Sequence, residues 1–143
     1  MQIREIMTRN VEVITPDTSL RQAAEKMRDL DVGSLPVCDG MRLQGMLTDR
    51  DITIRATAAG RDPAATSAAD VMTAKIFYCY DDQDVAEAAQ TMEDKQIRRL
   101  PIVNRDKRLV GILALGDVAV DTSEKRLAGE ALTEISRPSQ PER

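Results

Sequence analysis

The heptads GMLTDRD (residues 45–51) and GILALGD (residues 111–117) are two versions of one short sequence. Each begins with Gly, continues through an apolar residue and Leu to a small residue, and ends with Asp after two variable positions. They differ at the small residue, which is Thr48 in the first copy and Ala114 in the second. The recurrence, 66 residues apart, indicates that the chain consists of two similar halves.

Other short matches extend the repeat outward from the heptads. Met7-Thr8 recurs as Met72-Thr73, 65 residues later, and Leu35-Pro36 recurs as Leu100-Pro101 at the same offset. One inserted residue near Asp106 changes the offset to 66 before the second heptad. Because the matches keep their order across a single one-residue gap, we expect two copies of one structural unit.

Each copy is predicted to fold as β-α-β-β-α. Runs of β-branched and aromatic residues at 11–14 and 76–80 predict a first strand. A helix follows in each copy, because apolar residues recur at helical spacing: Leu20, Ala23, Ala24, Met27 and Leu30, then Val85, Ala88, Ala89 and Met92. Runs at 35–38 and 43–47, repeated at 100–103 and 109–113, predict the second and third strands, and a second helix begins at the end of each heptad.

Polar residues mark the ends of these elements. Ser19 with Gln22, and Asp84 with Glu87, predict a capping box at the start of each first helix. Residues 61–70 are a polar linker, so we divide the chain into a domain at 1–60, the linker, and a domain at 71–120. Residues 121–143 are predicted to form a C-terminal helix from Glu124 to Ile135 and then a disordered tail.

The predicted fold class is α+β, with two repeats packed by their sheets about a pseudo-twofold axis. Neither half of about 60 residues has much core of its own, which favours packing of one half against the other. The two cysteines, Cys38 and Cys79, lie in apolar strand-like runs, and small buried thiols are their favoured interpretation over a disulfide or redox pair.

Composition excludes several classes of function. The 20 Lys and Arg against 24 Asp and Glu give a net charge of −4, which argues against a nucleic-acid surface and against binding to anionic membranes. An apolar run long enough for a membrane helix and a signal peptide are both missing from the sequence, so a cytoplasmic protein is expected. With no His and no common catalytic motif, we expect neither an enzyme nor a metal site.

Thr48 and Asp51 admit two interpretations. Thr48 with an acid three residues later is typical of a helix N-cap, which by itself would explain both side chains. The second copy keeps Asp117 although Ala114 is a poor cap, which favours a separate role for the acid. A carboxylate suits the two hydroxyls of a ribose, and a helix N-terminus with a hydroxyl suits a neighbouring phosphate.

The ordered motif series, MT, P-D, L-x-x-A-A-x-x-M, LPV and the heptad, resembles a tandem pair of CBS domains, often called a Bateman module. The resemblance covers about residues 1–120 and is greatest to stand-alone bacterial proteins of the hypoxic-response type, including the segments TDRDI and AAG-x-DP. It implies adenosine-containing ligands such as AMP, ADP, ATP or S-adenosylmethionine, bound in clefts between the two domains without catalysis.

Carried over by position, the resemblance implies two clefts. The first would use Thr48 and Asp51 for phosphate and ribose, Thr73, Ile76, Phe77 and Ile97 around the base, and Arg98 near the phosphates. The second would use Asp117 for ribose and Arg99 for phosphate, with Thr8, Val11, Glu12 and Val32 from the first half. Ala114 departs from the pattern, and a lost neutral hydrogen bond costs about 0.5–1.5 kcal/mol, so the second cleft is expected to be weaker.

The resulting hypothesis is a cytoplasmic sensor that binds an adenosine compound as a regulatory ligand and needs no cofactor. The resemblance also implies a homodimer and an effector protein that the sequence does not identify. The alternative is an interaction or dimerisation module whose clefts are empty or vestigial.

Overall fold

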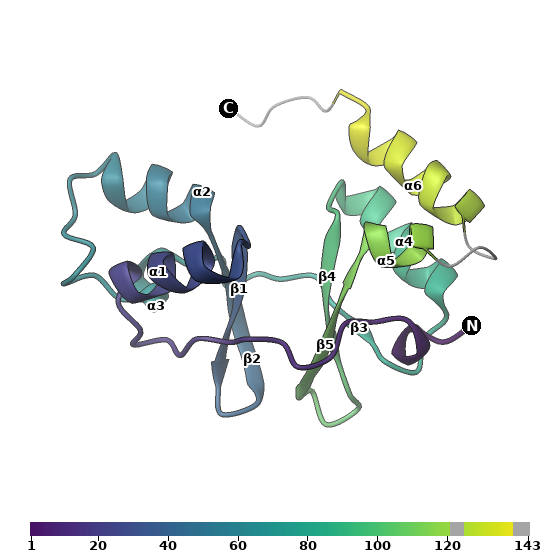
Figure 1. Cartoon of the computed structure of the whole chain (residues 1–143), viewed down its shortest axis with the longest axis horizontal. Coiled ribbons are helices and arrows are strands. Elements are labelled where there is room, and N and C mark those ends of the chain that lie inside the picture. Colours follow the sequence, from purple (N-terminus) through teal and green to yellow (C-terminus); the bar gives the residue numbers. More distant parts are fainter. Residues whose placement is uncertain (121–124, 139–143) are drawn as a thin grey trace. The chain divides into compact units, whose positions relative to one another are not determined.

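The computed structural model describes residues 1–120 and 125–138, and the chain divides into two compact units. One unit is the continuous stretch of residues 12–76. The other combines residues 1–11 with residues 77–143. Helices and strands alternate in each unit in the repeated order, which confirms the α+β class (Figure 1).

The unit of residues 12–76 is built on one hairpin. Helix α1 (Leu20–Leu30) leads into the antiparallel strands β1 (Ser34–Asp39) and β2 (Arg42–Thr48). A short helix α2 (Asp49–Asp51) follows and continues without a break as a π-helical segment (Ile52–Thr57). Helix α3 (Ala68–Val71) comes after the linker, whose backbone is tied to the start of α1 because the amide of Leu20 donates to the carbonyl of Thr66 at 3.0 Å.

The second unit repeats this plan and adds a helix. A 3₁₀ turn (Ile3–Glu5) opens it. Strand β3 (Cys79–Tyr80) pairs in parallel with β4 (Arg99–Val103), and β4 pairs antiparallel with β5 (Leu109–Ala114). Helix α4 (Val85–Lys95) precedes β4, and helix α5 (Leu115–Val120) follows β5. The predicted C-terminal helix is confirmed as α6 (Lys125–Ser136), which packs on α4 and α5. Of the predicted disordered tail, residues 139–143 lie outside the described residues.

The compact units are not the two sequence repeats, because each repeat lends its first segment to the other. Thr8, from the start of the first repeat, exchanges two backbone hydrogen bonds with Ile112 of β5, at 2.8 and 3.0 Å. Thr73, from the start of the second repeat, exchanges two with Met46 of β2, at 2.9 and 3.0 Å. The chain therefore divides at residues 11/12 and 76/77, and not within the linker of residues 61–70.

The Gly of each heptad is explained by this exchange. A Cβ at Gly45 would lie 2.7 Å from the carbonyl oxygen of Thr73, and a Cβ at Gly111 would lie 2.9 Å from that of Thr8. Both separations are shorter than a carbon–oxygen contact allows. Glycine is required because another segment of backbone passes close to these strands.

The predicted first strands are largely absent from the described residues. Of residues 11–14, Ile14 alone forms a bridge, in parallel with Val37, and the predicted strand at 76–80 shortens to Cys79–Tyr80. Both runs cross the points at which the chain leaves one unit and enters the other, so they do not continue in a single ladder.

The capping boxes of the first helices are only half formed. Ser19 Oγ accepts the amide of Gln22 at 3.1 Å, as predicted, but α1 has no reciprocal bond. Asp84 accepts the amide of Ala86, while Glu87 accepts a hydrogen bond from Gln83 Nε2 at 2.6 Å instead of reaching back.

Each unit has its own aliphatic core, and both cores draw on the exchanged segments. One contains Ile3 and Met7 together with residues of β4, β5, α4 and α6. The other contains Ala68 and Val71 together with residues of α1, β1 and β2. The two thiols are free and buried, as predicted, at Cys38 and Cys79.

Burial raises the pKa of the Cys38 thiol from 9.0 to about 11. At pH 8 only about one folded molecule in a thousand then carries a Cys38 thiolate, so we expect a disulfide-exchange reagent to label Cys38 only when the protein unfolds. Since the folded-state pKa is the higher one, the contribution to stability is complete below pH 9 and is lost as the pH rises from 9 towards 11. Labelling of Cys38 in native protein at pH 8, at the rate of a free thiol, would contradict this prediction.

Candidate functional site

The first heptad ends in a reciprocal pair of hydrogen bonds. Thr48 Oγ1 accepts the amide of Asp51, and Asp51 Oδ2 accepts the amide of Thr48, both at 3.0 Å. Thr48 has extended backbone angles and Asp51 is helical, so the pair forms a complete capping box at the start of α2. Asp51 is a buried charged residue, 7% exposed, and both side chains are held in fixed positions.

Arg55, a residue that the sequence analysis missed, connects this pair to the exchanged segment. Its Nη1 donates to the carbonyls of Val71 and Met72, at 3.0 and 3.3 Å, and lies 3.8 Å from Asp51 Oδ1. Val71 and Met72 immediately precede Thr73, so Arg55 positions the acid relative to the strand that pairs with β2. Its position four residues after Asp51 is the only signal in the sequence, and such spacing is common on helices.

The second heptad keeps half of the capping box. Asp117 Oδ2 accepts the amide of Ala114 at 2.9 Å, as Asp51 does with Thr48. The acid therefore has a structural role that does not need the threonine hydroxyl. The persistence of Asp117 beside Ala114 is explained by this bond, so it no longer argues by itself for contact with a ribose.

The residues that face each heptad differ in charge between the copies. The amide of Asp49 donates to the carbonyl of Gly33 at 2.9 Å, and in the second copy the amide of Leu115 donates to the carbonyl of Arg98 at 2.8 Å. In register, Ser34 lies opposite Thr48, whereas Arg99 lies opposite Ala114. The first copy thus has hydroxyls and carboxylates, and the second has two guanidinium groups.

The structure distributes the predicted site residues over both units. Thr48, Asp51, Thr73, Ile76, Glu12 and Val32 belong to residues 12–76, and Asp117, Arg98, Arg99, Thr8, Val11, Phe77 and Ile97 belong to the other unit. Each predicted cleft combines residues of both units, and that grouping stays a prediction.

Two of these residues have partners within their own units that the sequence analysis did not assign. Glu12 forms an ion pair with Lys26 of α1 at 3.2 Å. The ammonium of Lys95 lies 4.6 Å from the centroid of the exposed Phe77 ring. Thr8 and Thr73 are held by their backbone bridges, while Val32 and Ile97 are half-buried against the two cores.

Comparison with known proteins accounts for both copies of this arrangement. The CBS domain family matches residues 3–56 and, a second time, residues 68–120. The chain belongs to the CBS domain family. A CBS domain-containing protein of Bacillus subtilis, YhcV, is 42% identical over 134 residues, which are 94% of each chain. Hypoxic response protein 1 of Mycobacterium tuberculosis is 41% identical over 117 residues, 81% of each chain. These relatives are themselves CBS proteins of similar length, as the motif series indicated.

Solved CBS structures show the same fold. The crystal structure of Hypoxic Response Protein I with two coordinated zinc ions has a TM-score of 0.76 and 40% identity, covering 83% of this chain and 97% of that one. A CBS domain protein of Pyrobaculum aerophilum complexed with AMP has a TM-score of 0.76 at 23% identity, covering 91% and 99%. The CBS pair of protein MJ0100, in complex with 5-methylthioadenosine and S-adenosyl-L-methionine, has a TM-score of 0.72 at 23% identity, covering 83% and 97%.

The zinc of Hypoxic Response Protein I does not transfer to this CBS pair on the residues present. The sequence has no histidine. Within residues 1–120 and 125–138, no three Cys, Asp or Glu side chains form a group that could hold a metal ion. Over the same ranges, the helices are too short or too polar to cross a membrane.

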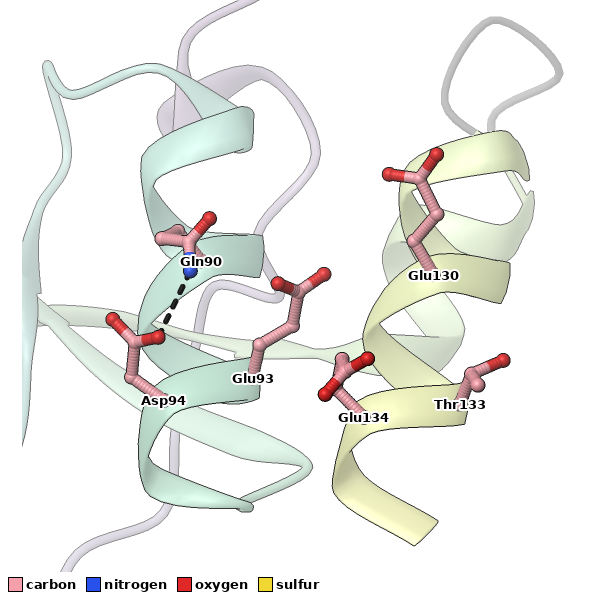
Figure 2. A pocket seen from close by; sticks show the side chains of 6 residues that line it. All are labelled: Gln90, Glu93, Asp94, Glu130, Thr133 and Glu134. Atoms are coloured by element: carbon pink, nitrogen blue, oxygen red, sulfur yellow. Dashed lines mark hydrogen bonds between the residues drawn. The ribbon is translucent and has the colours of Figure 1, made fainter. Parts of the chain in front are cut away.

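A groove between α4 and α6, beside the second CBS repeat, is acidic and contains none of the predicted site residues. Figure 2 shows Glu93 on α4 and Glu134 on α6 projecting towards the space between the helices, with Asp94 and Glu130 nearby. Gln90 donates to Asp94 at 2.9 Å along α4. Four carboxylates repel the phosphate of a nucleotide, so this groove is a poor candidate for the ligand site.

Proposed function

We propose that this CBS pair is a non-catalytic regulatory module that binds an adenosine-containing ligand through Thr48 and Asp51. The observation that carries the proposal is the reciprocal pair itself, in which backbone bonds at 3.0 Å fix a hydroxyl beside a buried carboxylate. Preorganised groups bind with less loss of side-chain entropy than mobile ones, which suits a sensor.

The capping bonds leave these side chains with capacity for a ligand. Thr48 Oγ1 accepts one hydrogen bond from Asp51 and keeps its own O–H, which can donate to a phosphate or hydroxyl oxygen. Asp51 uses Oδ2 for the amide of Thr48, and Oδ1 is able to accept from a ribose hydroxyl. The Asp51 side chain is 10% exposed, so a ligand would meet only its edge. A single well-placed contact is therefore expected, not a cage of carboxylates.

The ligand class rests on these residues and on family membership. AMP, 5-methylthioadenosine and S-adenosyl-L-methionine occupy proteins of the same fold, but the likeness of those proteins to this chain, at 23% identity, concerns the fold alone. We therefore retain AMP, ADP, ATP and S-adenosylmethionine as one class. The ligand would act as a regulator, and no cofactor is needed for that role.

Binding of this class is expected to raise the melting temperature of the protein by several degrees. A ligand at 100 times its Kd stabilises the folded state by about 2.7 kcal/mol. Asp51→Asn should abolish most of the shift, because the amide can still accept from Thr48 through its oxygen but places an NH₂ donor where Oδ1 would accept. A thermal-shift panel of AMP, ADP, ATP, NADH and S-adenosylmethionine measures this directly.

Asp117→Asn is the matched control, because it makes the same change at the equivalent position of the other heptad. A ligand-induced shift that survives in Asp51→Asn and disappears in Asp117→Asn would move the site to the second heptad. The absence of any shift across the panel would argue for clefts that no longer bind these ligands.

A homodimer and an effector protein complete the proposal. Exposed apolar side chains such as Leu30 and Ile54 supply surface that a second copy can cover. Light scattering of the purified chain tests the dimer, and a monomer at all concentrations would remove it. The cytoplasmic location stays a prediction.

A further inference from the structure

An open pocket of about 590 Å³ lies within the unit of residues 1–11 and 77–143. It lies between the adjoining ends of β4 and β5 and the helices α5 and α6, and it is lined by two arginines, five alanine or glycine residues and two leucines. Its volume falls in the range of about 300–1,000 Å³ that is typical of small-molecule sites.

The floor of the pocket contains two glycines that neither backbone geometry nor packing explains. Gly116 of α5 and Gly129 of α6 lack the positive φ that requires glycine, and an added Cβ at either would meet no heavy atom within 4 Å. Glycine in a helix costs roughly 0.5–1 kcal/mol relative to alanine. The effect of both glycines is to leave space, which is what a pocket for a ligand requires.

Arg98 and Arg99 place two positive charges at this space. The carbonyl of Arg98 is held by the amide of Leu115 at 2.8 Å, and Arg99 lies opposite Ala114 in the β4–β5 register. Neither guanidinium forms an ion pair with a residue that the structure describes. No acidic side chain lines the pocket, in contrast to the groove on the α4 side of α6.

We propose that this pocket binds a small organic anion, whose carboxylate or phosphate is held by Arg98 and Arg99 and whose apolar body packs on the floor between α5 and α6. Guanidinium groups match carboxylate and phosphate geometry and are weakly hydrated, so they suit an anion beside apolar surface. The alanine and glycine floor offers hydrocarbon contact and few hydrogen bonds. Ala114 contributes to that floor, so the broken heptad position is here part of an apolar wall.

The site is separate from the proposed adenosine site. Asp117 does not line it, and Thr48 and Asp51 belong to the other unit. The family resemblance assigned Arg98 and Arg99 to two different clefts, whereas both line this one pocket.

The test is an NMR titration of the ¹⁵N-labelled full chain with octyl phosphate, using inorganic phosphate and 1-octanol as the two halves of the probe. Octyl phosphate should shift the amides of Arg98, Arg99, Gly116 and Gly129. Arg98→Gln/Arg99→Gln should weaken its binding about tenfold or more, because hydrogen bonds to charged groups contribute the most. Arg42→Gln/Lys75→Gln, which removes two exposed charges from the other unit, should change it by less than about twofold because surface charges at a distance are screened.

Gly129→Leu tests the floor without threatening the fold. Leucine is a good helix former and its Cβ enters open space, so the variant should melt no lower than the parent while its affinity for octyl phosphate falls about tenfold or more. Unchanged binding in Gly129→Leu, or 1-octanol binding as tightly as octyl phosphate, would overturn the proposal. So would AMP binding that shifts the same amides and is lost in Gly129→Leu, since the pocket would then be a nucleotide site. The adenosine site is tested through Asp51→Asn in the other unit, so either proposal can fail alone.

Discussion

A fragment of residues 12–76 is expected to unfold in one cooperative transition, whereas a fragment of residues 1–60 is expected to remain unfolded. The first matches a compact unit and the second matches a sequence repeat. The two have nearly the same length, so the comparison isolates the contribution of the exchanged segment. This is the largest effect that the structure predicts, because one fragment keeps a complete core and the other does not.

The core of residues 12–76 explains the difference. Ala68 and Val71 are 0% and 3% exposed in that unit, and Thr73 supplies two hydrogen bonds to β2. Residues 1–60 lack all of these and instead carry Ile3 and Met7, whose partners lie in the other unit. A domain of about 60 residues buries only about 60% of its unfolded surface and is marginal, so losing one wall of the core leaves too little to fold.

Circular dichroism with urea measures the prediction, since a folded fragment gives a sigmoidal transition and an unfolded one gives a flat line. A fragment of residues 77–143 should also fail to fold alone, because Ile3 and Met7 are missing from its core. Its recovery on adding a peptide of residues 1–11 would support the exchange directly. A cooperative transition in residues 1–60 would contradict it.

The sequence predicted the elements of the fold well and their partners poorly. Helical spacing and strand runs located α1, α4 and both hairpins within one or two residues. The exchange of segments was not visible, because a repeat shows that Met7-Thr8 and Met72-Thr73 are alike and carries no information about which strand each one pairs with. The close approach at Gly45 was foreseen only as an approach of backbone or ligand, and the structure assigns it to backbone.

Equivalent positions also differ where an added element covers one copy. Ala24 and Ala89 match in the repeat, yet Ala24 is exposed on α1 while Ala89 is buried on α4, the helix that packs with α6. Leu30 was predicted on the buried face of α1 and is 42% exposed. The spacing of apolar residues identifies a helix face, but the number of neighbours on that face depends on tertiary packing.

The candidate site was predicted in its residues and only partly in its reasoning. Thr48 and Asp51 are held together as the heptad indicated, and the capping interpretation is confirmed for that pair. The argument from Asp117 was weaker than it looked, because a capping box has two independent bonds and the acid can keep one of them after the hydroxyl is lost. Sequence comparison detects that a residue persists, whereas its bonding partner is visible only in the structure.

Replacement of Gly45 by alanine is expected to destabilise the protein by about 1–3 kcal/mol, the usual cost of overpacking. The new Cβ would lie 2.7 Å from the carbonyl oxygen of Thr73 and 2.9 Å from Met72 Sδ. The sulfur can rotate away, but the carbonyl belongs to a backbone that exchanges two hydrogen bonds with Met46, so relief requires that bridge to lengthen. A fall in melting temperature of roughly 3–10 °C is the expected measurement.

Gly129→Ala is the matched control for Gly45→Ala, because its Cβ enters open space on a helix and no positive φ opposes it. It should stabilise the protein by roughly 0.5–1 kcal/mol through helix propensity. Equal melting temperatures for the two variants would show that the exchanged segment yields without cost, and the close approach at Gly45 would then not determine the choice of glycine. Opposite shifts would show that the heptad glycine is selected by the backbone that crosses it, which leaves Thr48 and Asp51 as the positions of the first heptad available to a ligand.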